Sequence, residues 1–169
     1  MGPSGPKARQ LSSGLYTPEE RRRRDASVWT TVQAILAPVQ FLIFAVSLVL
    51  VVRYLAYGVG YEAATVSILL KTLALYTIMV TGAIWEKVVF GQYLFAPAFF
   101  WEDAFSMIVI VLHTLYIYAL FVGWSAEMQM LIALAAYATY VVNAGQFLWK
   151  LRQARLQGVE TRPPQEAAA

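Results

Sequence analysis

Four long apolar runs constrain the fold of this chain more than any other feature of its sequence. They cover residues 26–52, 63–85, 104–123 and 128–149. A helix that crosses the ~30 Å hydrocarbon core of a membrane needs roughly 20 mostly apolar residues, and each run is at least that long. Hydrophobic residues make up 59% of the chain, compared with roughly 45–50% in soluble domains. The sequence therefore predicts an all-α integral membrane protein built as a four-helix bundle.

The segments outside the runs are short. Residues 1–15 are rich in Gly, Ser and Pro, and we expect a disordered tail there. A second disordered tail is expected over residues 156–169, which leaves 16–155 as one domain. A short basic helix should precede the first run, because Thr17-Pro18-Glu19-Glu20 combines an N-cap, a first-turn proline and a capping-box glutamate.

The distribution of charge predicts how the bundle lies in the membrane. Basic residues gather at both ends of the bundle, at Arg21 to Arg24 and at Lys150 to Arg155. Four spans place both termini on one side, and the positive-inside rule assigns that side to the cytoplasm. The chain has no cysteine and one histidine, which excludes disulfides, thiolate sites and metal sites that need two histidines.

Residues 85–103, WEKVVFGQYLFAPAFFWED, form the most unusual segment and connect the second and third runs. Gly91 and Pro97 should prevent one continuous helix through it. The segment is too apolar for an ordinary loop, so we expect it to lie at the cytoplasmic interface or to re-enter the membrane. We expect it to hold a ligand or reacting groups.

Polar residues within the first two runs have two interpretations. Gln33, Gln40 and Ser47 recur every seven residues and should share one helix face, where interhelical hydrogen bonds are the favoured role and pocket lining the alternative. Lys71 is costly inside a membrane. We expect it to extend toward the near interface, with pairing or a polar cavity as alternatives.

The third run carries a polar stripe. Its members follow a three-four spacing and should lie on one helix face: Glu102, Ser106, Val109, His113 and Tyr116. Glu102 and His113 are separated by ~16 Å of helical rise, which is too far to share an ion but suits a large flat ligand. A lone imidazole is a good axial ligand for a tetrapyrrole metal. The alternative is a buried histidine bonded to a neighbouring helix.

Three carboxyl groups border the unusual segment, at Glu86, Glu102 and Asp103. Carboxyls beside apolar surroundings can serve as general acids. The alternative is a set of interfacial charges paired with Lys87. In the fourth run, Asn143 belongs to a small polar face that favours helix packing, with ligand or water positioning as the other interpretation.

Several strings in the chain resemble one known family. They are LYTPEERRRRDASVWT, ILAPVQFL, TGAIWEKVVFGQYLFAPAFFWEDAFSM and NAGQFLWKLRQAR, and they are similar to the 3-vinyl bacteriochlorophyllide hydratases over residues 15–155. The resemblance implies a membrane-bound lyase that adds water to the C3-vinyl group of chlorophyllide a, or of a close relative, to give the 3-(1-hydroxyethyl) product.

Hypothetical roles follow from that chemistry. Glu102 or Glu86 would protonate the vinyl group, and Asp103 would orient the water. His113 would ligate the substrate magnesium or bond a ring substituent, and Lys87 would pair with the propionate. The aromatic residues expected to contact the macrocycle are Trp85, Phe95, Phe99, Phe100 and Trp101.

The resemblance also implies a cellular setting. The expected location is the bacterial cytoplasmic or intracytoplasmic photosynthetic membrane, and the expected partners are the chlorin substrate and lipid, with no nucleic acid. A second copy of the chain or other pigment-biosynthesis enzymes are further candidate partners. Hydration is redox-neutral, so no cofactor is expected. The alternatives are a non-catalytic tetrapyrrole-binding or photosystem assembly protein, a small channel or transporter, and a hydratase of the chlorosome-pigment branch.

Overall fold

All the regular secondary structure in the described part of the chain is helical. A computed structural model describes residues 15–160, with side chains as far as residue 154. Its helices are α1 (Pro18–Ala26), α2 (Val28–Tyr57), α3 (Tyr61–Phe90), α4 (Phe100–Val122) and α5 (Ala126–Glu160). Helices α2 to α5 are each long and apolar enough to cross a membrane. The predicted all-α architecture with four candidate spans is confirmed.

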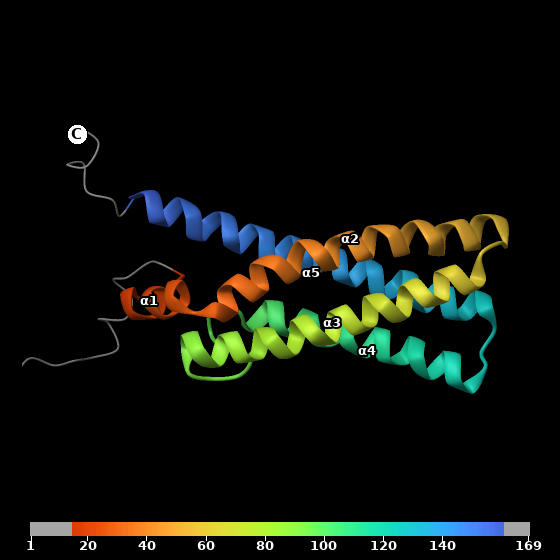
Figure 1. Ribbon diagram of the computed structural model, residues 1–169, viewed down its shortest axis with the longest axis horizontal. Coiled ribbons are helices and arrows are strands. Elements are labelled where there is room, and N and C mark those ends of the chain that lie inside the picture. The colour runs from red at the N-terminus through yellow and green to blue at the C-terminus, as the bar shows by residue number, and fades with distance from the viewer. Residues whose placement is uncertain (1–14, 161–169) are drawn as a thin grey trace, which may run out of the picture.

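The four long helices form an elongated bundle (Figure 1). Helix α1, the α3–α4 connection and the C-terminal part of α5 lie at one end, and the α2–α3 and α4–α5 turns lie at the other. Helix α2 packs mainly on α3, and α4 packs mainly on α5, while contact between these two hairpins is sparser. We call the boundary between the α2–α3 hairpin and the α4–α5 hairpin the seam.

Helix α1 begins at the predicted capping box. The Thr17 hydroxyl accepts the Glu20 N–H at 3.2 Å, and the Glu20 carboxylate accepts the Thr17 N–H at 2.8 Å. The Ser27 hydroxyl accepts the Trp29 N–H at 3.2 Å and starts α2. The basic helix is therefore separate from the first long helix, as the sequence predicts.

The α3–α4 connection is where the helix boundaries matter most for function. Gly91 ends α3 with a φ of 85°, a left-handed conformation that glycine adopts without a Cβ clash. The predicted break at Gly91 and Pro97 is confirmed. However, α4 begins at Phe100, before the predicted start at 104. Glu102 and Asp103 thus lie in a first helical turn, where exposed N–H groups favour negative charge.

The predicted domain limits meet the described residues at both edges. Leu15, predicted to belong to the N-terminal tail, packs against a buried cluster that contains Tyr16. Helix α5 continues to Glu160, past the predicted boundary at 155. The remainder of both predicted tails, residues 1–14 and 161–169, lies outside the described residues.

Polar bonds cross the bundle between its apolar layers. The Ser47 hydroxyl contacts the Ser67 hydroxyl at 2.7 Å and the Tyr137 hydroxyl at 2.6 Å. Gln33 donates to the Thr81 hydroxyl at 2.8 Å. The predicted interhelical role is confirmed for Gln33 and Ser47. Gln40 is buried, and within residues 15–154 its Oε1 has no hydrogen-bond partner.

Ser47 joins three helices, so its loss should weaken the bundle. We expect Ser47→Ala to lower the free energy of unfolding by about 1 kcal/mol, as for other interhelical bonds in membrane proteins. Thr139→Ala is the matched control, because the Thr139 hydroxyl bonds the Ala135 carbonyl of its own helix. Reversible unfolding in mixed micelles measures both variants, and equal losses would contradict the bridging role.

Candidate active site

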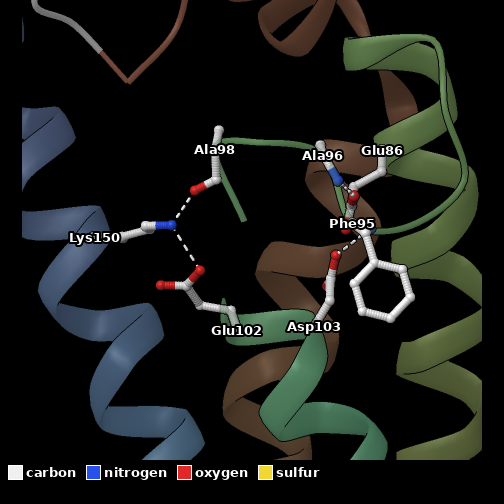
Figure 2. A network of polar contacts seen from close by, with 7 residues as sticks. All are labelled: Glu86, Phe95, Ala96, Ala98, Glu102, Asp103 and Lys150. Carbon is white, nitrogen blue, oxygen red and sulfur yellow. Dashed lines mark hydrogen bonds and ion pairs between the residues drawn. The ribbon is translucent and has the colours of Figure 1, made fainter. Parts of the chain in front are cut away.

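Three buried carboxyl groups lie together at the end of the bundle that carries α1. Glu86 comes from α3, and Glu102 and Asp103 come from the first turn of α4. Each residue is at most 5% exposed. Figure 2 shows Glu86 and Asp103 directed toward the same stretch of the α3–α4 connection, while Glu102 faces Lys150 of α5. The sequence therefore identified three groups that the fold does bring together.

Glu86 and Asp103 form a carboxyl pair between α3 and α4. Glu86 Oε2 accepts the Ala96 N–H at 3.2 Å, and Asp103 Oδ2 accepts the Phe95 N–H at 2.7 Å. The two carboxyl groups are close enough to interact directly, and burial disfavours the ionisation of both at once. Ionised carboxylates are acceptors only, so a hydrogen bond between them requires a proton on one of the two. The pair is therefore a buried site that can hold one transferable proton.

The backbone that contacts this pair is strained. Phe95 has a φ of 59°, the only positive value at a non-glycine residue in the described chain. A left-handed conformation costs such a residue on the order of 1–2 kcal/mol. The Asp103 bond to the Phe95 N–H and the Glu86 bond to the Ala96 N–H hold the connection in this conformation. Strain of this kind is common where a loop shapes a functional site.

Glu102 has a different environment, because a lysine neutralises it. Lys150 Nζ lies 2.6 Å from Glu102 Oε2 and also donates to the Ala98 carbonyl. A charge-assisted bond of this kind favours the ionised carboxylate. The sequence indicated Lys150 only as a topology signal. Lys150 follows the fourth run, and that run returns the chain to the end of the bundle that holds Glu102. This position is the sequence signal that indicates the pairing.

Lys87 does not pair with these carboxyls, so that alternative is wrong. Its ammonium donates to the Gly91 carbonyl at 2.7 Å and lies 5.3 Å from the centre of the Tyr93 ring. As the last-turn residue of an exposed helix end, Lys87 satisfies a free terminal carbonyl of α3. Its side chain is exposed and faces away from the buried cluster.

The predicted aromatic contact residues divide into two groups. Phe99 is buried in an aromatic cluster next to the carboxyl site, which contains Tyr16, Trp85, Phe90, Phe99 and Phe147. Phe95, Phe100 and Trp101 are exposed and form an outer row with ring centroids 5.7 and 5.5 Å apart. The aromatic cluster packs within the protein, and the outer row is the group available to a ligand.

Tyr16 closes the site from the N-terminal side. Its ring stacks on Phe90 at 5.8 Å, and the Arg24 guanidinium lies 4.7 Å from its centre. Burial raises the pKa of the Tyr16 hydroxyl above its ordinary value, against the opposing effect of Arg24. The hydroxyl is therefore neutral at physiological pH. Trp85 Nε1 donates to the Thr30 hydroxyl at 2.9 Å, which ties α3 to α2.

Asn143 lies one helical turn deeper than the carboxyls. Its Nδ2 donates to the Ser106 hydroxyl at 2.9 Å, and both residues are buried. The Asn143 Oδ1 has no hydrogen-bond partner among the residues whose side chains are described. A buried amide oxygen without a partner is a candidate acceptor for a water or ligand. Helix packing alone, the favoured interpretation, therefore does not account for the whole side chain.

The predicted polar stripe on α4 is confirmed, because its five members are all buried. His113 Nδ1 donates to the Val109 carbonyl at 2.8 Å, so it bonds its own helix rather than a neighbour. Within the described side chains, His113 Nε2 has no hydrogen-bond partner. The expectation that Lys71 reaches the interface is wrong, since Lys71 is fully buried, 3.5 Å from the Tyr140 ring centre.

Comparison with known proteins identifies close relatives. A family model described as 2-vinyl bacteriochlorophyllide hydratase matches residues 16–153. A protein of that name from Rhodobacter capsulatus is 80% identical over 143 residues, which is 85% of this chain and 84% of the relative. One from Cereibacter sphaeroides is 70% identical over 156 residues, 92% of this chain and 96% of the relative. No solved structure matches the chain significantly.

The Glu102–Lys150 pair gives a stability prediction. We expect Lys150→Met to destabilise the protein by about 3 kcal/mol, because it leaves a buried carboxylate unpaired. The double variant Glu102→Gln with Lys150→Met should recover most of that loss. Lys87→Met is the control, since its ammonium contacts a surface carbonyl. Unfolding free energies in mixed micelles test this, and equal effects of the two lysine variants would refute the pairing.

Proposed function

The chain belongs to the 2-vinyl bacteriochlorophyllide hydratase family, and we propose that it adds water to the vinyl group of a chlorophyllide in bacteriochlorophyll synthesis. The family match spans residues 16–153, which include all the candidate site residues. The proposed substrate is chlorophyllide a or a close relative, and the product carries a 3-(1-hydroxyethyl) group. The 2-vinyl and 3-vinyl names describe the same substituent in two numbering conventions for the macrocycle.

We propose that helices α2 to α5 span the bacterial cytoplasmic or intracytoplasmic membrane as one domain. Their length and apolar composition support this. Arg21 to Arg24 on α1 and Lys150 on α5 lie at the same end of the bundle, which the positive-inside rule assigns to the cytoplasm. The buried carboxyls would then face the cytoplasmic membrane surface, where an amphiphilic chlorophyllide can enter from the lipid.

The observation that carries the proposal is the adjacent, buried pair of carboxyl groups of Glu86 and Asp103, which we propose to share one proton. Vinyl hydration begins when a general acid delivers a proton to the terminal vinyl carbon. The two π electrons form the new C–H bond, and the inner carbon becomes a cation conjugated with the macrocycle. Water then forms the C–O bond and loses a proton to a carboxylate. One proton leaves the pair and one returns, so the enzyme is regenerated.

The helix ends support a division of roles within the pair. Asp103 lies in the first turn of α4, where the helix dipole stabilises negative charge, and Glu86 lies near the C-terminal end of α3, where the dipole opposes it. We therefore assign the proton to Glu86 as the general acid. Asp103 is the carboxylate that orients the attacking water and receives its proton.

Glu102 contributes differently in this scheme. Its ion pair with Lys150 makes it a poor proton donor, and its place beside Asp103 keeps the Lys150 charge close to the reacting pair. That charge stabilises the carboxylate left after Glu86 gives up its proton. Glu102 and Lys150 therefore position charge rather than transfer the proton.

The remaining residues would bind the substrate. Lys87 is exposed at the end of α3, and Phe100 and Trp101 offer aromatic surface for the macrocycle. Asn143 Oδ1 can hold a water one turn below the carboxyls, and His113 Nε2 can ligate the substrate magnesium or bond a ring substituent. Hydration changes no oxidation state overall, so the scheme uses no redox cofactor.

An in vitro assay tests the function. The purified protein, in nanodiscs, is incubated with 3-vinyl chlorophyllide a, and the pigment is analysed by absorption and mass spectrometry. The expected product is heavier by one water and absorbs at shorter wavelength, because the vinyl group leaves the conjugated system. Binding of the pigment without a mass change would instead support a non-catalytic pigment-binding protein.

Variants of the carboxyls test the assigned roles. We expect Glu86→Gln and Asp103→Asn each to lower kcat by roughly 10²–10⁴-fold, the usual contribution of general acid–base catalysis, while pigment binding is retained. Glu62→Gln is the matched control, because Glu62 is exposed in the first turn of α3, at the other end of the helix from Glu86. Near-normal turnover in Glu86→Gln would remove Glu86 as the acid and return that role to Glu102.

A further inference from the structure

A second group of polar and aromatic side chains lies deep in the bundle, where all four long helices meet. Lys71 Nζ of α3 lies 3.5 Å from the ring centre of Tyr140 on α5 and 5.9 Å from that of Phe44 on α2. The Phe44 ring contacts Tyr140 and Tyr137 at 4.9 and 5.4 Å, and Tyr137 lies 5.9 Å from His113 of α4. We call these five residues the inner cluster of the seam.

Lys71 is not satisfied by its surroundings. It is 0% exposed, and no hydrogen-bond partner for its Nζ exists among side chains and backbone of the described range. A cation–π contact with Tyr140 offsets only part of the cost of removing an ammonium from water. Ionisable groups at such depth usually serve a function. The aromatic walls and the free donors of Lys71 together resemble a ligand site with one polar anchor.

His113 helps to define which ligand group this anchor would take. Its Nδ1 hydrogen is used by the Val109 carbonyl, so in the neutral imidazole Nε2 is an acceptor. An acceptor cannot bind a carbonyl oxygen. Of the two nitrogen-bearing side chains in the inner cluster, Lys71 is therefore the one with free hydrogen-bond donors, and the ligand group that matches it is an oxygen acceptor.

The inner cluster lies at a definite depth below the carboxyl site. Along α4, His113 follows Glu102 by eleven residues, and along α5, Tyr140 precedes Lys150 by ten. These spacings correspond to ~16 and ~15 Å of helical rise. Along α3, Lys71 precedes Glu86 by fifteen residues, or ~22 Å of helical rise. The inner cluster therefore lies about three to four turns from the carboxyls. It also lies on the seam, where contact between the hairpins is sparse.

We propose that Lys71 binds the ring-carbonyl oxygen at the rim of the substrate macrocycle that lies opposite the vinyl group. This inference rests on the proposed function, which places the vinyl group at Glu86 and Asp103. In a chlorophyllide the carbonyl-bearing fifth ring lies across the macrocycle from the vinyl-bearing ring. A macrocycle that enters along the seam would therefore present its vinyl group to the carboxyls and its carbonyl to Lys71. Lys71 is then a specificity-determining residue.

Binding of two substrate analogues tests this without any turnover. Both carry an ethyl group in place of the vinyl group, so neither can be hydrated; one keeps the ring carbonyl and the other has a methylene there. The wild-type protein should bind the carbonyl analogue roughly tenfold or more tightly, as expected when a buried donor would otherwise be left without a partner. Lys71→Met should bind both with about equal affinity. Lys71→Gln, which keeps a donor, should retain part of the preference.

Vibrational spectroscopy supplies a readout that needs no variant. The carbonyl stretching frequency of the bound analogue should fall relative to the free pigment, because the Lys71 hydrogen bond weakens the C=O bond. No preference between the analogues in the wild-type protein, or an unshifted carbonyl band, would overturn the proposal. An equal preference in the wild type and Lys71→Met would also overturn it. Loss of turnover with this preference intact would count only against the hydratase proposal.

Discussion

The structure depends on how an apolar bundle accommodates three buried carboxyl groups at one end. One lysine, Lys150, neutralises Glu102, while Glu86 and Asp103 remain together as a pair that can share a proton. The surrounding backbone is arranged around this solution. The α3–α4 connection directs two N–H groups at the pair, and α4 starts early enough for Asp103 to lie in its first turn. Hydration requires a proton held next to an apolar substrate. The burial of three carboxyl groups, which is the main electrostatic cost of this fold, can supply such a proton.

Another buried ionisable group, in this case a basic one, lies in the middle of the bundle. Lys71 is buried against Tyr140 and Phe44 on the seam between the hairpins. The carboxyl site and Lys71 therefore lie at different depths along the bundle. Ser106 and Asn143 lie between them, and His113 lies beside the Lys71 group. The hairpins have their own extensive internal contacts, so the seam can carry polar groups without loss of the bundle. In the proposed scheme, this arrangement places substrate specificity and chemistry at opposite ends of one ligand.

Much of this architecture was predictable from local sequence patterns. The apolar runs predict the four long helices, the capping box predicts α1, and the three-four spacing from Glu102 to Tyr116 predicts a stripe that is indeed buried. The apolar run alone predicts a start of α4 that is too late, because it excludes Glu102 and Asp103, although a first helical turn favours acidic residues. The Lys150 partner, the burial of Lys71 and the inward position of Phe99 depend on packing between distant helices. No local spacing specifies such contacts.

The central claim is that Glu86 and Asp103 hold one proton between them at neutral pH. Infrared difference spectroscopy of the purified protein tests it directly, because a protonated carboxyl has a C=O stretching band distinct from those of a carboxylate. The account predicts one such band in the wild-type protein, which shifts when glutamate is ¹³C-labelled at its carboxyl and disappears when Glu86 is replaced by glutamine. A spectrum with carboxylate bands alone at neutral pH, or a protonated band that survives that replacement unchanged, would contradict it.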